Sequence, residues 1–158
     1  LDEECLELMQ KQNTFLVPIL CAPQCILDKG VENGVTKYAV DKTLKVTKAH
    51  VESVKKAYAK GIQIALGTDA GTPFNYHSNT AYEMELMAQL NISNMDIIKI
   101  ATINSAKCLD VEKDYGSIEV GKQADLVCLN ENPLDDISNV RKINRVIQSG
   151  RIVVDNTR

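Results

Sequence analysis

The sequence predicts an α/β fold with a parallel sheet, followed by a shorter all-β segment. The uncharged run 62–66, rich in branched residues, is typical of a strand that is buried on both faces. Residues 14–20 are a second uncharged β-type run, in which Pro18 is expected to mark a strand end or a bulge. An amphipathic stretch at 44–60 separates them, and the order strand, helix, strand requires a parallel sheet. After residue 113 the pattern changes to short strand-like runs. We therefore expect two units, residues 1–112 and residues 113–158.

Three helices and one long loop are expected in the first unit, besides the helix at 44–60 that Gly61 ends. Asp2 is the expected N-cap of a helix that extends to about residue 11. Thr80 and Glu83 have the spacing of a capping box, and Ser93 opens the next helix. Residues 21–41 show no clean period and are predicted to form a long loop with room for one helical turn. The apolar side of the Ser93 helix is expected to contain Ile97, Ile100, Ala101 and Leu109.

The second unit is expected to contain strands at 124–129, 144–148 and 151–154. Ser149 and Gly150 stand between the last two runs. A two-residue connection of this kind is typical of a β-hairpin.

Composition excludes several classes of protein. The net charge is −3, the pI is about 5.4 and the lysines are scattered, so nucleic acid is not expected as a partner. No apolar run reaches the roughly 18 residues of a membrane span, and the first residues do not resemble a signal peptide. The five cysteines are expected to be reduced and mostly buried in a cytoplasmic protein, with a site shared by Cys21 and Cys25 as the alternative.

Asp69 is the leading candidate for a functional residue. It follows the run 62–66, and ligands of α/β folds bind where strands end. The alternative is that Asp69 caps a turn or a helix. His77 lies on the same loop and is expected either to face a ligand or to be a surface or capping residue. His50 is expected to be exposed on the polar side of its helix.

Residues 116–123 match most of a phosphate-binding P-loop. Gln123 replaces the Ser or Thr whose hydroxyl would hold magnesium, and a strand follows where the motif needs a helix. We therefore reject this interpretation.

Three blocks resemble, in order and spacing, the carboxyl-terminal part of the amidohydrolase superfamily. They are GTDAGTP at 67–73, ATINSAK at 101–107 and GSIEVGKQADLV at 116–127. The resemblance is greatest to the imidazolonepropionase-like and Xaa-Pro or Xaa-Arg dipeptidase (prolidase-like) metal-dependent hydrolases. It implies that residues 14–20 and 62–66 are strands seven and eight of a TIM-like (β/α)8 barrel, and that the tail is part of a small flanking β-sandwich.

The same resemblance implies a site and a reaction. Asp69 would bind a divalent metal, zinc in a binuclear centre, and would take a proton from the metal-bound water. His77, Thr72 and Asn75 are expected substrate contacts. The expected reaction is hydrolysis of a C–N bond, peptide-like or in a cyclic amide, in a small-molecule or dipeptide substrate. The full-length protein is expected to form a homo-oligomer.

The family's other metal ligands are missing from this chain. A His-x-His pair, a carboxylated Lys and two further His residues have no counterpart here, and the chain begins with Leu1. We therefore expect a fragment that is inactive and holds no metal tightly alone, because catalytic zinc needs about three protein ligands and two strands close no barrel. The alternatives are a non-catalytic scaffold relative and a piece that associates through open sheet edges.

Overall fold

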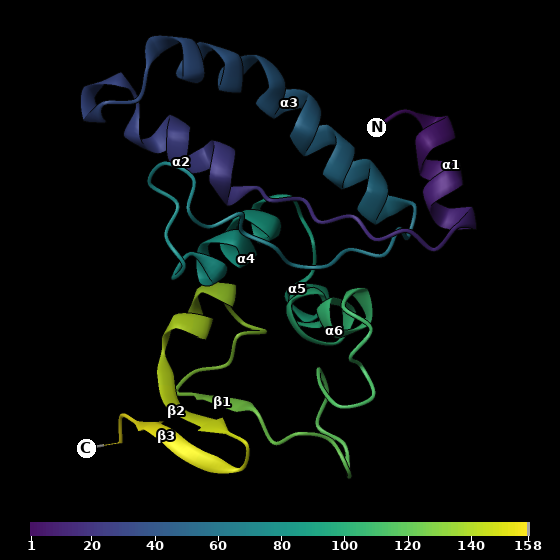
Figure 1. Ribbon diagram of the computed structural model, residues 1–158, viewed down its shortest axis with the longest axis vertical. Helices are drawn as coiled ribbons and strands as arrows, with labels where there is room; N and C mark the ends of the chain where they lie inside the picture. The colour runs from purple at the N-terminus through teal and green to yellow at the C-terminus, as the bar shows by residue number, and fades with distance from the viewer. Residues whose placement is uncertain (158) are drawn as a thin grey trace.

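The computed structural model describes residues 1–157, and its helices precede a small sheet (Figure 1). The elements are α1 (Glu3–Lys11), α2 (Cys21–Lys29), the 3-10 turn η1 (Val31–Asn33), α3 (Lys37–Ala59), α4 (Thr80–Gln89), α5 (Asn94–Lys99), the π-helical turn η2 (Ile100–Asn104), α6 (Ser105–Cys108), β1 (Leu126–Leu129), the 3-10 turn η3 (Ile137–Arg141), β2 (Ile143–Gln148) and β3 (Arg151–Asp155). The α/β class is therefore confirmed. No helix within residues 1–157 is long and apolar enough to cross a membrane.

The two predicted strands are segments that lie side by side in parallel; 62–66 is largely buried, whereas Thr14 and Val17 of the other segment are exposed. The backbone N–H of Leu16 donates to the carbonyl of Gln63 at 2.8 Å, and the N–H of Ala65 donates to the carbonyl of Leu16 at 3.0 Å. The parallel direction is as predicted, but the pairing is one isolated bridge between Leu16 and Ile64. Pro18 has no N–H with which to continue the ladder.

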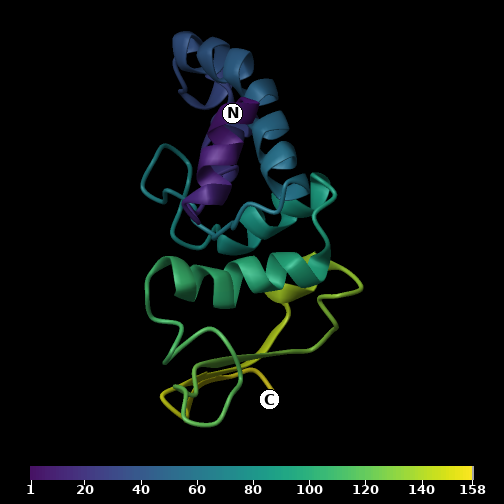
Figure 2. The ribbon, with the colours of Figure 1, turned by 90° about the vertical axis from the view of Figure 1, so that its right-hand side faces the viewer.

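The main core lies between the extended segment 62–66 and helices α3, α4 and α5. Its most buried members are Cys21, Val54, Ile64, Met87 and Ile97. A second cluster of Leu6, Ala57 and Ile62 fixes α1 against α3, and Figure 2 shows these two helices side by side. Apolar packing thus holds the segment that leads to Asp69 on several sides.

The region predicted to be a loop at 21–41 contains helix α2, so that prediction is wrong. Pro23 lies in the first turn of this helix, where its missing N–H is tolerated. The next helix, α3, begins at Lys37, before the predicted residue 44, because the hydroxyl of Thr36 accepts a hydrogen bond from Ala39 N at 3.2 Å.

Two further helix predictions are corrected. Asn79, and not Thr80, is the N-cap of α4, and Glu83 turns away from this end of the helix, so no capping box forms. The helix after Ser93 begins as predicted, with Ser93 Oγ accepting from Asp96 N at 3.1 Å. Leu109, expected on its apolar side, is 72% exposed because it follows the last turn of α6.

The sheet at the carboxyl end has the order β1-β2-β3 and is antiparallel throughout. The predicted hairpin is confirmed, since Gln148 pairs with Arg151 and both Ser149 (φ 50°) and Gly150 (φ 76°) have left-handed backbones. Figures 1 and 2 both show the sheet beyond α5 and α6, and β3 is one of its two edge strands, as Figure 1 shows. Arg141 of η3 forms an ion pair with Glu85 of α4 at 2.6 Å, which links the two parts.

Candidate functional site

The turn that carries Asp69 follows directly from the parallel-paired segment. A Cβ added to Gly67 would lie 2.5 Å from Val17 Cγ1, so the close approach of the two segments requires glycine there. Asp69 has a left-handed backbone, with φ 51°, and an exposed side chain. Its carboxylate accepts no hydrogen bond from residues 1–157, so the chain does not use it as a cap.

Asn75 holds this turn in shape from inside the protein. Its side chain is 1% exposed, and Nδ2 donates to the carbonyl oxygens of Thr68 and Asp69, the latter at 3.1 Å. Its Oδ1 accepts from Asn79 Nδ2 at 3.0 Å. Asn75 therefore ties the turn to the start of α4, although its amide is occupied by protein partners.

Thr72 and His77 complete the set of residues predicted from the sequence. The half-buried Thr72 donates from Oγ1 to the carbonyl of Asp69 at 3.2 Å. His77 is exposed two residues beyond Asn75 on the same loop. The structure thus joins Asp69, Thr72 and Asn75 through hydrogen bonds, whereas His77 shares only their loop. Contact of these residues with substrate stays a prediction.

Glu83 was not predicted to take part in this region. It is fully buried, and its carboxylate accepts hydrogen bonds from Leu20 N at 2.8 Å and from Cys21 N at 2.6 Å. Burial raises the pKa of Glu83, and the two N–H donors only partly oppose this effect. Glu83 therefore caps the first turn of α2, whose own N-cap, Leu20, has no side-chain acceptor.

Cys21 and Cys25 lie on the buried side of α2, next to the same hydrogen-bond network. Cys21 Sγ donates to the carbonyl of Thr68 at 3.3 Å, and Asn79 Nδ2 donates to Cys25 Sγ at 3.6 Å. Burial, followed by the charge of Glu83, raises the pKa of Cys21 to about 12. Both side chains are therefore structural thiols at neutral pH.

The prediction that most cysteines are buried is wrong. Within residues 1–157 all five are free, but Cys5, Cys108 and Cys128 are exposed. The same part of the chain contains no group of three or more His, Cys, Asp or Glu side chains placed to hold a metal. The exposed, unpartnered carboxylate of Asp69 fits one ligand position of a divalent metal, and the remaining ligands would come from outside this chain.

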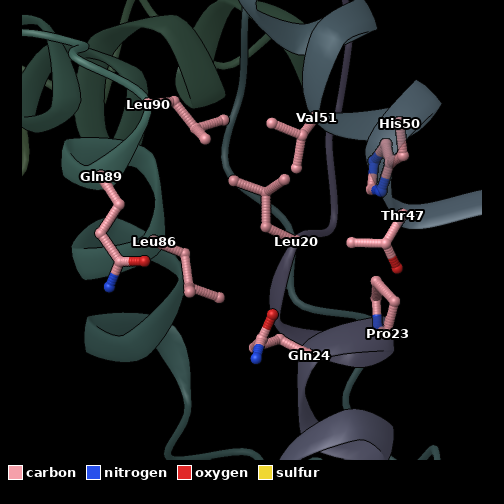
Figure 3. Close-up of a pocket in the computed structure, with 9 residues that line it drawn as sticks. All are labelled: Leu20, Pro23, Gln24, Thr47, His50, Val51, Leu86, Gln89 and Leu90. Atoms are coloured by element: carbon pink, nitrogen blue, oxygen red, sulfur yellow. The ribbon is translucent and has the colours of Figure 1, made fainter. Parts of the chain in front are cut away.

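His50 was predicted to be exposed on the polar side of its helix, and this prediction is wrong. Its Nε2 lies 2.7 Å from the carbonyl oxygen of Pro18, and the ring is half-buried. The ring borders a pocket of about 70 Å³ between α2, α3 and α4 (Figure 3). Figure 3 shows Leu20 between the side chains of α4 and those of α3. Asp69 does not line this pocket, which has room for only a few water molecules.

The chain belongs to the amidohydrolase family, because the sequence model of that family matches residues 4–153. It is 33% identical over 124 residues to a 5-methylthioadenosine/S-adenosylhomocysteine deaminase of Thermoanaerobacter pseudethanolicus, a match that covers 65% of this chain. It is 43% identical over 72 residues, 45% of this chain, to an imidazolonepropionase of Picrophilus torridus. The family resemblance is confirmed.

A solved structure agrees with this assignment. A Xaa-Pro dipeptidase with bound methionine in its active site aligns with 96% of this chain at a TM-score of 0.87 and 34% identity. The chain covers 37% of that dipeptidase, 28% of the deaminase and 18% of the imidazolonepropionase. It therefore spans less than half the length of each of these relatives.

Proposed function

We propose that this chain is the carboxyl-terminal part of a metal-dependent amidohydrolase, which hydrolyses a C–N bond of a small substrate by means of metal-activated water. Asp69 carries the proposal: its carboxylate is exposed and unpartnered, while Asn75 and Thr72 hold its backbone. The relatives are named for reactions at peptide-like, cyclic amide and amine C–N bonds. Those names support a dipeptide or a cyclic amide as the substrate class.

Each residue of the loop has a part in the proposed mechanism. A divalent metal, zinc in this proposal, would supply a water whose pKa is lowered towards neutrality. Asp69 would hold the metal at one ligand position, and its carboxylate would take up the proton released when the water is activated. Asn75 and Thr72 keep the Asp69 backbone in its left-handed conformation. His77 and Thr72 are the proposed substrate contacts on this loop, whereas the buried Asn75 supports the loop from inside.

The cellular setting is part of the same proposal. Free thiols are typical of a reducing compartment, which favours the cytoplasm. The complete enzyme would work as a homo-oligomer. By itself this chain would be inactive, because it supplies one metal ligand where about three are needed.

A non-catalytic scaffold relative is the second candidate function. The presence of Asp69 with an unoccupied carboxylate argues against it, since a scaffold needs no acid at this position. Metal content separates the two candidates, because a scaffold that has lost its ligands binds none.

The test compares this chain with a product of the same gene that is extended at its amino terminus. We expect only the extended protein to hold about two metal ions and to hydrolyse dipeptides or cyclic amides. Asp69→Asn should lower kcat/KM by about 100-fold or more. Asp110→Asn is the matched control, because Asp110 is also an exposed Asp with a left-handed backbone, at φ 59°. Turnover within a few-fold of wild type in Asp69→Asn would refute the role of general base.

A further inference from the structure

The segment that carries Asp69 is bonded along both of its backbone edges. On one edge, Leu16 donates to the carbonyl of Gln63 and accepts from the N–H of Ala65. On the other edge, Asn104 Nδ2 donates to the carbonyl of Ile64 at 3.2 Å, and Ser105 Oγ accepts from the N–H of Leu66 at 3.0 Å.

The second pair of bonds repeats the pattern of the first. A residue of a parallel strand donates to one carbonyl and accepts from the N–H two residues further on. Leu16 forms these two bonds with the carbonyl of residue 63 and the N–H of residue 65. The side chains of Asn104 and Ser105 together form the same two bonds with the carbonyl of residue 64 and the N–H of residue 66. Two side chains from a helix thus take the place of one residue of a neighbouring strand.

The π-helical turn η2 accounts for this arrangement. Ser105 Oγ donates to the carbonyl of Ile100 at 2.7 Å, five residues earlier, where a serine in an α-helix would reach four residues back. Its proton is therefore committed to Ile100, and the oxygen is free to accept from Leu66. Such turns are rare and frequently mark functional sites.

We infer that Asn104 and Ser105 are positioning residues of the proposed hydrolase site. They fix the backbone at Ile64 and Leu66, and Asp69 follows Leu66 by three residues. This inference rests on the proposed function, since it assigns the two residues to the placement of Asp69.

The first experiment measures amide hydrogen exchange at Leu66. Ser105→Ala should raise that exchange rate about tenfold or more, because the N–H loses its acceptor. Ser105→Thr keeps the hydroxyl and should restore the wild-type rate. Thr102→Val is the matched control, because Thr102 Oγ1 donates to the carbonyl of Ile98 at 2.6 Å. This bond lies within the helical region and does not involve the segment 62–66. An unchanged Leu66 rate in Ser105→Ala would overturn the inference.

The second experiment measures turnover in the amino-terminally extended enzyme. Ser105→Ala and Asn104→Asp should each lower kcat by about 10- to 100-fold, with KM within about twofold, because a small misplacement of a catalytic group has effects of this size. Ser105→Thr should recover most of the loss. A kcat of Ser105→Ala equal to that of Thr102→Val would mean that Ser105 only stabilises the fold.

The two proposals fail in different ways. If Asp69→Asn retains activity, the role proposed for Asp69 is wrong whatever Leu66 exchange shows. If Asp69→Asn is inactive while Ser105→Ala and Asn104→Asp behave like Thr102→Val, only the positioning inference is wrong.

Discussion

Glu83 accepts a hydrogen bond of 2.6 Å from the backbone N–H of Cys21, a residue 62 positions earlier in the chain. The other carboxylate oxygen accepts from the N–H of Leu20. Through this side chain, α4 sets where the segment 14–20 ends and where α2 begins. The start of α2 thus depends on one buried acid, and Cys21 at this start donates from Sγ to the carbonyl of Thr68, next to Asp69.

Replacement of Glu83 should destabilise the protein strongly. Glu83→Ala leaves two buried N–H groups without an acceptor, and we expect the free energy of unfolding in urea to fall by about 3 kcal/mol. Glu52→Ala is the control, because Glu52 forms only an exposed ion pair with Lys55, and it should change stability by less than about 0.5 kcal/mol. Equal effects of the two changes would contradict the role of Glu83 as a cap.

Glu83 should also make stability depend on pH. Burial raises its pKa above the ordinary value of 4.5, so between 4.5 and the raised pKa the folded chain binds more protons than the unfolded chain. The contribution of Glu83 to the free energy of unfolding is therefore fully present below about pH 4.5, and it is lost as the pH rises through the raised pKa. The measurement is urea unfolding at a series of pH values, for wild type and Glu83→Gln. If the free energy of unfolding of wild type, relative to that of Glu83→Gln, increased with pH, the predicted pH dependence would be wrong.

The cysteines should divide into two classes of reactivity. Cys108 and Cys128 are exposed, whereas Cys21 is fully buried and burial raises its pKa to about 12. Because the thiolate is the reacting form, iodoacetamide at mildly alkaline pH should label Cys21 about 100-fold more slowly than Cys108. Mass spectrometry of the digested protein gives both rates, and urea should abolish the difference. Equal rates in the folded protein would show that α2 opens readily.

Gly116 and Gly150 both have left-handed backbones, but replacement by alanine should lower the stability of the protein more at Gly116 than at Gly150. At Gly150 (φ 76°) a Cβ meets nothing within 4 Å, so Gly150→Ala should cost about 1–2 kcal/mol for the left-handed backbone alone. At Gly116 (φ 89°) a Cβ would lie 2.8 Å from Ala106 Cβ, which adds about 1–3 kcal/mol. Urea unfolding of both variants tests this order, and a reversed order would contradict it.

The parts of the fold that were predictable depend on local patterns. The uncharged runs predicted the two parallel segments, and the apolar face of α3 predicted most of that helix. The Ser149-Gly150 pair predicted the hairpin. Each of these signals lies within a few residues of the structure that it predicts. The position of Asp69 after a buried run is a signal of the same kind.

The errors come from partners that are distant in sequence. Helix α2 was missed because its capping group, Glu83, lies in another helix. The capping box at Thr80 fails for the same reason, since the carboxylate that it needs is bound elsewhere. The environment of His50 depends on the carbonyl of Pro18, 32 residues earlier. Asn104 and Ser105 lie in the block 101–107, which was noticed only through the family resemblance.

The left-handed backbone at Asp69 limits the mutational routes open to this position. Asp, Asn and Gly adopt such a conformation readily, whereas branched and bulky residues are strained there. A descendant that lost the carboxylate of Asp69 without reshaping the loop would therefore carry Asn or Gly here. In diverged copies of the gene, Asp at this position would indicate selection for the carboxylate. Asn or Gly would indicate selection for the left-handed backbone alone.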